Sequence, residues 1–241
     1  MSQTERRPED DPRFQRVRAS LIGALTELAA EKPAEKISVS ELTAKAGVSR
    51  TTFYKHADSP PQLLASYLIT QIRPVMDPMT TLLKSAEEDY LLRWRDIMVD
   101  LLEHVRDNQA IYSHVFVGEG ESVVLSILTR YFERIYVEYV EDFAEHVGDE
   151  TATELWKAMA TSQQVHNLIA IISSWLRTAM VDSPEAVVST YMSLAPPWQL
   201  AKFSPTGRTS LRRNRVVASL LESISNDDDR AATPNSPEVT C

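Results

Sequence analysis

Two short helical segments joined by a glycine, within residues 38–56 (SVSELTAKAGVSRTTFYKH), constrain the fold more than any other stretch of the chain. Ser38 followed by Glu41 is a capping box, in which the serine oxygen accepts a backbone N–H and the carboxylate reaches back to the cap. Gly47 can adopt the positive φ that a tight turn after a helix requires. Ser49 is placed to cap the next segment. These residues therefore predict two helices held at an angle by the turn.

The second segment, Arg50 to His56, contains one strongly apolar side chain, Phe53. With Phe53 turned inward, the outer face carries hydrogen-bonding side chains, which suits a helix that enters the DNA major groove. Lys55 and His56, toward the end of the segment, are expected to hold phosphates. The expected DNA contacts on both helices are Ser38, Ser40, Thr43, Ser49, Arg50, Thr51, Thr52, Tyr54, Lys55 and His56. Tyr54 could instead be a structural aromatic, and two capped helices around a glycine also occur in ordinary helical bundles.

Local charge supports the nucleic-acid interpretation. Four Lys and Arg residues against one glutamate give residues 36–56 a net charge of +3, whereas the whole chain has a net charge of −9. A positive patch on an acidic protein suits a surface that faces phosphates, because most of the affinity for DNA is electrostatic. Arg13, Arg16 and Arg18 lie near the start of the preceding amphipathic segment, where they could approach phosphates or form a solvated face.

Residues 37–68 (ISVSELTAKAGVSRTTFYKHADSPPQLLASYL) also resemble the N-terminal DNA-binding region of the TetR-type transcriptional regulators. The resemblance covers roughly Arg13 to Ile72, and AGVSRTTFYKH is its most specific part. It implies an all-helical homodimer with two recognition helices and a C-terminal domain that senses a ligand and dimerises. It also implies a repressor that binds a double-stranded DNA operator and is released by a small-molecule effector.

Two departures from the family pattern follow the second segment. The family usually has an aromatic residue where Ala57 stands, and a Lys-Glu pair where Pro60 and Pro61 stand. The lysine of that pair normally touches a phosphate, so one contact is missing, although proline fits the first helical positions after a Ser59 cap. The alternative function is therefore a helical dimer that acts mainly through a protein partner, with weak or lost DNA binding.

Composition favours helices throughout the chain. Only 6 glycines occur in 241 residues, and 43% of the residues are hydrophobic, so we expect an all-α fold with a substantial core. Pro74 and Pro78 are expected to end the helix that starts after the Ser59 cap, and to mark the boundary between the domains. The predicted parts are a disordered N-terminus (1–12), a helix-turn-helix domain (13–73), a helical ligand-sensing and dimerisation domain (74–198), and a disordered tail that could hold one short helix (199–241).

Apolar residues at spacings of three and four predict the helices of the second domain. These helices are expected at Tyr90–Asn108, Gln109–Val117, Ser122–His146, Ala152–Met180 and from about Pro184 to Leu194. The N-terminus has no apolar signal region, and no apolar run is long enough to span a bilayer. The single cysteine, Cys241, leaves no disulfide within one chain. We therefore expect a cytoplasmic protein that makes no contact with a membrane.

No group of residues indicates catalysis, a metal or a cofactor. The five histidines are scattered, and neither a phosphate-binding glycine loop nor a nucleophile elbow occurs. We therefore expect that the protein is not an enzyme.

An effector site is expected in the second domain, among aromatic and polar residues of its helices. The candidates are Trp94, Met98, Phe116, Tyr131, Gln163, His166 and Asn167, and for each the alternative is plain core packing. The last three share one face of an apolar helix, where they could bind a ligand or each other across a dimer.

The last two predicted helices resemble the dimerisation pair of the family. The first of them is apolar on more than one side, and small residues would allow a partner helix to approach closely. A symmetric pair from each subunit would form a four-helix interface. The residues expected there are Ile169, Ala170, Ser173, Ser174, Arg177, Val187 and Tyr191.

Overall fold

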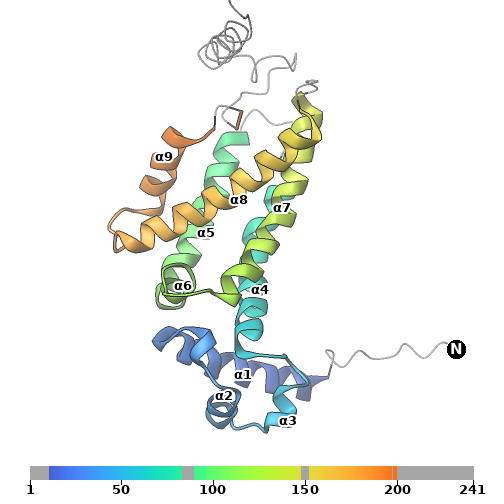
Figure 1. Cartoon of the computed structure of the whole chain (residues 1–241), viewed down its shortest axis with the longest axis vertical. Coiled ribbons are helices and arrows are strands. Elements are labelled where there is room, and N and C mark those ends of the chain that lie inside the picture. The colour runs from blue at the N-terminus through green and yellow to red at the C-terminus, as the bar shows by residue number, and fades with distance from the viewer. Residues whose placement is uncertain (1–10, 83–89, 148–151, 197, 200–241) are drawn as a thin grey trace, which may run out of the picture.

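The structure, a computed structural model, describes residues 11–82, 90–147, 152–196 and 198–199. Within these ranges the chain is all-helical and contains no strand (Figure 1), which confirms the predicted fold class. Nearly all of the predicted disordered N-terminus and tail lies outside the described residues.

Four elements form one end of the molecule (Figure 1). They are α1 (Pro12–Glu31), the 3-10 helix η2 (Ala34–Lys36), α2 (Val39–Ala46) and α3 (Arg50–Phe53). The first helix starts where it does because the Asp11 side chain accepts the N–H of Arg13 at 2.8 Å and Pro12 occupies the first turn. These elements share a small core, since Leu21, Leu25, Leu42 and Phe53 are buried, and Val48 is partly buried against the same cluster.

The fourth helix, α4 (Pro60–Thr81), connects this end to the rest of the molecule (Figure 1). The prediction that Pro74 and Pro78 end it was wrong, because the helix runs through both prolines. Both are exposed, whereas Met76 between them is fully buried against the bundle. Burial of that face therefore stabilises the helix more than the two missing N–H groups destabilise it.

Among the described residues, a bundle of five helices forms the second, larger part. It consists of α5 (Tyr90–Asp107), α6 (Gln109–Phe116), α7 (Val123–Val147), α8 (Glu154–Arg177) and α9 (Pro184–Leu194). These bounds differ from the predicted ones by only a few residues. The N-cap of α8 is Thr153, and the cap of α9 is Ser183 followed by Pro184. None of the described helices has both the length and the apolar character needed to cross a membrane.

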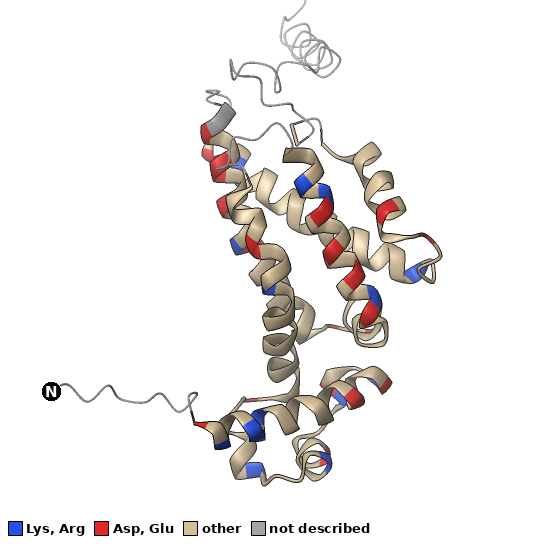
Figure 2. Ribbon diagram, turned by 180° about the vertical axis from the view of Figure 1, so that it is seen from behind, with Lys and Arg blue, Asp and Glu red and all other residues tan. Residues whose placement is uncertain are grey.

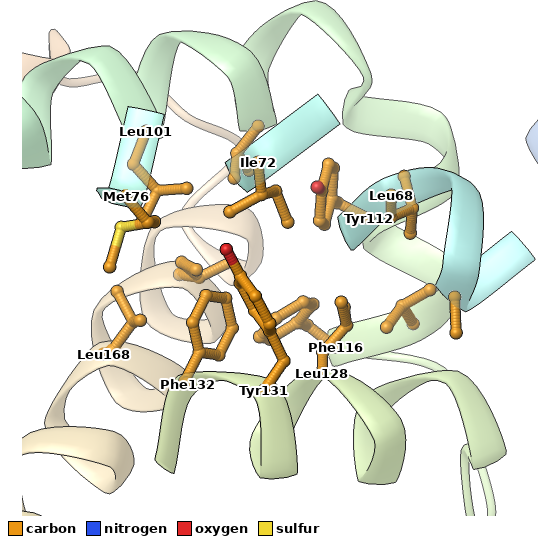
Figure 3. Close-up of a cluster of buried hydrophobic side chains, with 14 of the residues drawn as sticks. Leu68, Ile72, Met76, Leu101, Tyr112, Phe116, Leu128, Tyr131, Phe132 and Leu168 are labelled. Carbon is orange, nitrogen blue, oxygen red and sulfur yellow. The ribbon is translucent and has the colours of Figure 1, made fainter. Parts of the chain in front are cut away.

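Apolar side chains from α4 to α8 meet in the interior of the bundle (Figure 3). The labelled members of this cluster are Leu68, Ile72, Met76, Leu101, Tyr112, Phe116, Leu128, Tyr131, Phe132 and Leu168. Because Leu68, Ile72 and Met76 belong to α4, the core of the bundle is built directly onto the helix that follows the helix-turn-helix.

A second connection joins the two parts of the molecule. Helix α6 packs against α1, and the Glu35 carboxylate of η2 accepts the backbone N–H of Val123 at 2.8 Å. This bond satisfies one of the free N–H groups at the start of α7, where a negative charge is favourable. Two separate contacts besides α4 therefore connect the bundle to the N-terminal helices.

Candidate nucleic-acid interface

The first helix of the motif starts as the sequence predicts. The Ser38 Oγ accepts the N–H of Glu41 at 3.1 Å. The Glu41 carboxylate lies 2.6 Å from the ammonium of Lys32, and this hydrogen bond lowers the pKa of Glu41, with the Ser38 backbone N–H lowering it further. The capping box is thus present, and Lys32 links it to the end of α1.

The turn also has the predicted conformation. Gly47 lies in the left-handed region, with φ 67° and ψ 31°, and the N–H of Val48 donates to the Thr43 carbonyl at 3.0 Å. The Ser49 Oγ accepts the N–H of Thr52 at 3.1 Å and caps α3. The angle between α2 and α3 is therefore fixed by local bonds.

The second helix is shorter than predicted, since α3 ends at Phe53 and not at His56. The N–H of His56 donates to the Phe53 carbonyl at 2.8 Å, which tightens the chain into a turn. Contacts from α1 hold the turn: the rings of Phe14 and His56 are 3.9 Å apart, and Arg18 donates to the His56 carbonyl at 3.4 Å. Packing against α1 therefore ends the helix. The spacing of apolar residues in the sequence does not reveal such packing.

The tip of the motif presents polar side chains to solvent around one buried anchor. Phe53 is fully buried, whereas the next residue, Tyr54, is 54% exposed and packs edge-on against the Phe53 ring. The other exposed residues among the predicted DNA contacts are Ser38, Ser40, Ser49, Arg50, Thr51 and Lys55. Arg50 on α3 donates to the Ser40 hydroxyl on α2 at 3.4 Å, so the two helices share one polar surface.

Three of the predicted DNA contacts are not exposed. Thr43 is only 4% exposed, and its hydroxyl donates to the Val39 carbonyl of its own helix at 2.8 Å, so burial removes it from the outer face. The Thr52 hydroxyl lies 2.8 Å from the Ser49 hydroxyl and strengthens the cap of α3. His56 is half-buried, and its pKa is lowered by burial and by the nearby charges of Arg18 and Lys55.

An ion pair and a hydrogen bond engage two cations at this end of the molecule. Lys45 lies 2.8 Å from Glu27, so it joins α2 to α1. Arg18 donates to Ser66 of α4 at 3.1 Å. Arg50 of α3 and Lys55 just after it are both exposed. Figure 2 shows that acidic residues are frequent on the bundle, away from the helix-turn-helix end.

Five of the seven predicted effector residues lie in two groups. Phe116 and Tyr131 belong to the cluster between α4, α6 and α7 (Figure 3). Trp94, Gln163 and Asn167 lie near α9: Trp94 stacks on Tyr191 at 5.6 Å, Asn167 donates to the Tyr191 hydroxyl at 3.2 Å, and Gln163 accepts from Trp198 at 3.3 Å. Met98 is buried, and His166 is exposed, with its Nδ1 2.8 Å from the carbonyl of Ser162 on the same helix.

Four buried polar residues near α9 were not predicted. Gln164 and Gln199 are 2% and 1% exposed, and both belong to a hydrogen-bonded group that includes Tyr90 and Tyr139. A signal existed for Gln164, because it stands next to Val165 in an otherwise apolar stripe. Gln199 lies in the part of the chain predicted to be a disordered tail, so no periodic pattern marks it.

A groove of about 290 Å³ lies between α8 and α9. Four of the residues predicted for the dimer interface line it: Ala170, Ser174, Val187 and Tyr191. Ser173 is buried, Ile169 is half-buried, and Arg177 is exposed at the end of α8. Within the described ranges, no three His, Cys, Asp or Glu side chains gather as a metal site.

Two protein-family models match the chain. The model of bacterial regulatory proteins of the tetR family matches residues 21–67, and the model of a transcriptional regulator C-terminal region matches residues 93–196. Together they cover the helix-turn-helix and most of the bundle. No curated protein matches the sequence.

Solved structures share the fold at low identity. NalD of Pseudomonas aeruginosa, the secondary repressor of the MexAB-OprM multidrug efflux pump, is 16% identical with a TM-score of 0.56, over 76% of this chain and 95% of NalD. The fatty acid degradation regulator FadR of Bacillus halodurans is 15% identical with a TM-score of 0.51, over 73% of this chain and 96% of FadR. The arrangement of helices is therefore one that transcriptional regulators use.

Proposed function

Because the chain belongs to the TetR family of transcriptional regulators, we propose that it is a repressor that binds an operator as a homodimer and leaves it when a small molecule binds. Proteins of this family regulate transcription through DNA and are not enzymes. The observation that carries the proposal is the tip of the helix-turn-helix, where Phe53 is fully buried and the residues around it are polar and exposed.

In this proposal α3 lies in the major groove. Arg50, Thr51 and Tyr54 face outward from its buried anchor, so they contact base edges or the nearest phosphates. Lys55 and the hydroxyls of the capping serines contact the backbone on either side. Thr43 and Thr52 hold the motif together through the bonds described above and contribute indirectly.

The homodimer forms through α8 and α9. Leu155 and Met159 of α8 are 70% and 65% exposed, and Leu194 of α9 is 77% exposed. Large apolar side chains in this position favour a partner surface, since each Å² of apolar area buried contributes roughly 25 cal/mol. Ala170 and Ser174 border the adjoining groove and are small enough to let a second α8 approach. A second copy of the chain would then present two recognition helices to two half-sites.

The effector acts through α4. Its first half packs on α1 and η2, and its second half lies in the cluster with α5 and α7 (Figure 3). A small molecule that binds the bundle better in one position of α4 than in another shifts the population toward that position. Because Arg18 of α1 bonds both the turn after α3, at His56, and Ser66 of α4, such a shift would change the separation of the two recognition helices.

The test is fluorescence anisotropy of the full chain on DNA from upstream of its own gene and on scrambled DNA, across a salt series. We expect specific binding that the Arg50→Ala/Tyr54→Ala double variant loses, because each good base contact contributes about 1–3 kcal/mol. Arg106→Ala, which removes an exposed cation from α5, is the matched control and should leave binding unchanged. Equal weak binding to every sequence in a genome-wide selection would contradict the repressor and favour action through a protein partner.

A further inference from the structure

Trp198 and Gln199 follow α9 outside any helix, yet they are only 8% and 1% exposed. A carboxamide that leaves water loses its hydrogen bonds to the solvent, and the cost is high unless the protein replaces them. The end of the bundle must therefore supply groups that fit an amide.

Three donors from three different helices converge on Gln199. Its side-chain oxygen accepts from the amide of Gln164 on α8 at 3.1 Å and from the hydroxyl of Tyr191 on α9 at 2.8 Å. Its backbone carbonyl accepts from the hydroxyl of Tyr90 on α5 at 3.0 Å. Further bonds orient two of these donors, since Tyr90 lies 2.6 Å from the Tyr139 hydroxyl and Asn167 donates to Tyr191.

All three donors are uncharged. Burial raises the pKa of Tyr90, and burial also raises the pKa of Tyr191, so both hydroxyls keep their protons near neutral pH. A neutral carbonyl group gains hydrogen bonds here without requiring an opposite charge. A carboxylate in the same position would lose its hydration and find no cation among these donors.

An aromatic compartment adjoins the amide-binding groups. The ring of Trp198 lies edge-on to Phe143 at 5.0 Å and to Trp156 at 5.4 Å, which is a favourable geometry for aromatic pairs. The Trp198 indole donates to Gln163 at 3.3 Å. The end of the bundle therefore accommodates a flat ring and a carbonyl group side by side.

The hydrogen bonds at this end of the bundle are incomplete. The amide nitrogen of Gln199 is buried and has no hydrogen-bond partner among the described residues. The same holds for the indole nitrogen of Trp94, whose ring stacks on Tyr191. A compound that offers an acceptor to Trp94 would leave fewer buried groups unpaired than the chain itself does.

We propose that this end of the bundle is a recognition site for a neutral carbonyl compound with an aromatic ring, and that Trp198 and Gln199 occupy it as an internal ligand which such a compound displaces. Binding at this site stands on its own geometry. Only its consequence, the release of DNA, rests on the proposed function.

The test uses the full chain carrying Trp198→Ala and Gln199→Ala, titrated by calorimetry with benzamide, benzoate and toluene. We expect benzamide to bind this variant about tenfold or more tightly than it binds the natural chain, where the internal ligand competes. Benzoate, which is charged, and toluene, which lacks the carbonyl, should bind far more weakly. Adding Tyr191→Phe should weaken benzamide roughly three- to tenfold, because one donor is lost. Equal binding of benzamide and benzoate, or no effect of Tyr191→Phe, would overturn the proposal.

A second measurement needs no destabilising change. In the natural chain, saturating benzamide should expose the Trp198 indole and so increase quenching of tryptophan fluorescence by iodide, and Trp198→Phe should abolish that increase. Unchanged quenching would contradict displacement. Anisotropy on operator DNA is recorded in parallel: benzamide that binds at this site without releasing DNA refutes its effector role while leaving the site intact.

Discussion

The turn of the helix-turn-helix can be tested with two glycines that differ in one property. Gly47 has φ 67°, whereas Gly23 lies within α1. A Cβ built at either position would meet no atom within 4 Å, so steric clashes do not enter the comparison. Replacing each by alanine therefore isolates the cost of the left-handed backbone conformation.

The expected difference in the free energy of unfolding follows from two effects. Alanine restricts the unfolded chain in both variants, which contributes about 0.4–1 kcal/mol to the free energy of unfolding. At Gly47 alanine must also adopt the left-handed conformation, which costs about 1–2 kcal/mol. The unfolded-chain contribution is common to both variants. We therefore expect Gly23→Ala to be stabilising, and Gly47→Ala to be less stable than Gly23→Ala by at least about 1–2 kcal/mol.

The assay is urea unfolding of the full chain, followed by circular dichroism at one fixed protein concentration, because the proposed dimerisation would link stability to concentration. Gly47→Asn should recover part of the loss, since asparagine tolerates the left-handed region better than alanine does. Equal effects of the two alanine variants would refute the argument. A Gly47→Asn variant as unstable as Gly47→Ala would also contradict it.

Three further outcomes are expected. Ser49→Ala removes the cap of α3 and should lower the free energy of unfolding by about 1 kcal/mol, measured by urea unfolding, with Ser20→Ala on the exposed face of α1 as a control. Tyr90→Phe removes the hydroxyl that serves Gln199 and should cost about 1–3 kcal/mol, and no change in melting temperature would argue against that buried bond. Burial lowers the pKa of His104 below the usual 6.5, so stability should decline as the pH falls through that value, and His104→Gln should flatten the decline.

The local features of the helix-turn-helix could be predicted because each is encoded within a few residues. Ser38 and Ser49 cap their helices through backbone N–H groups three positions away. Gly47 takes the left-handed conformation for a reason that depends only on its missing side chain. The burial of Phe53 follows from its position as the one apolar residue in a polar segment. These features can therefore be predicted without knowledge of the rest of the chain.

Other features could not be predicted, because distant residues determine them. The helix α4 continues through Pro74 and Pro78 because its other face is buried in the bundle. Leu155 and Met159 fit a buried helical stripe by their spacing, yet they are exposed in the single chain. Periodicity shows that a face is apolar and does not show what covers it.

The sequence alone determined the all-helical class, the helix-turn-helix with its caps, and the order and approximate bounds of the helices of the bundle. These properties depend on backbone hydrogen bonds and on side-chain spacing within single helices, which neighbouring residues decide. Tertiary structure alone decided where α3 stops, that Lys45 forms an ion pair with Glu27, and that Gln199 lies inside the bundle. Those outcomes depend on groups such as Phe14, Glu27 and Tyr90, which are far apart from their partners in the chain and meet them only when the helices pack.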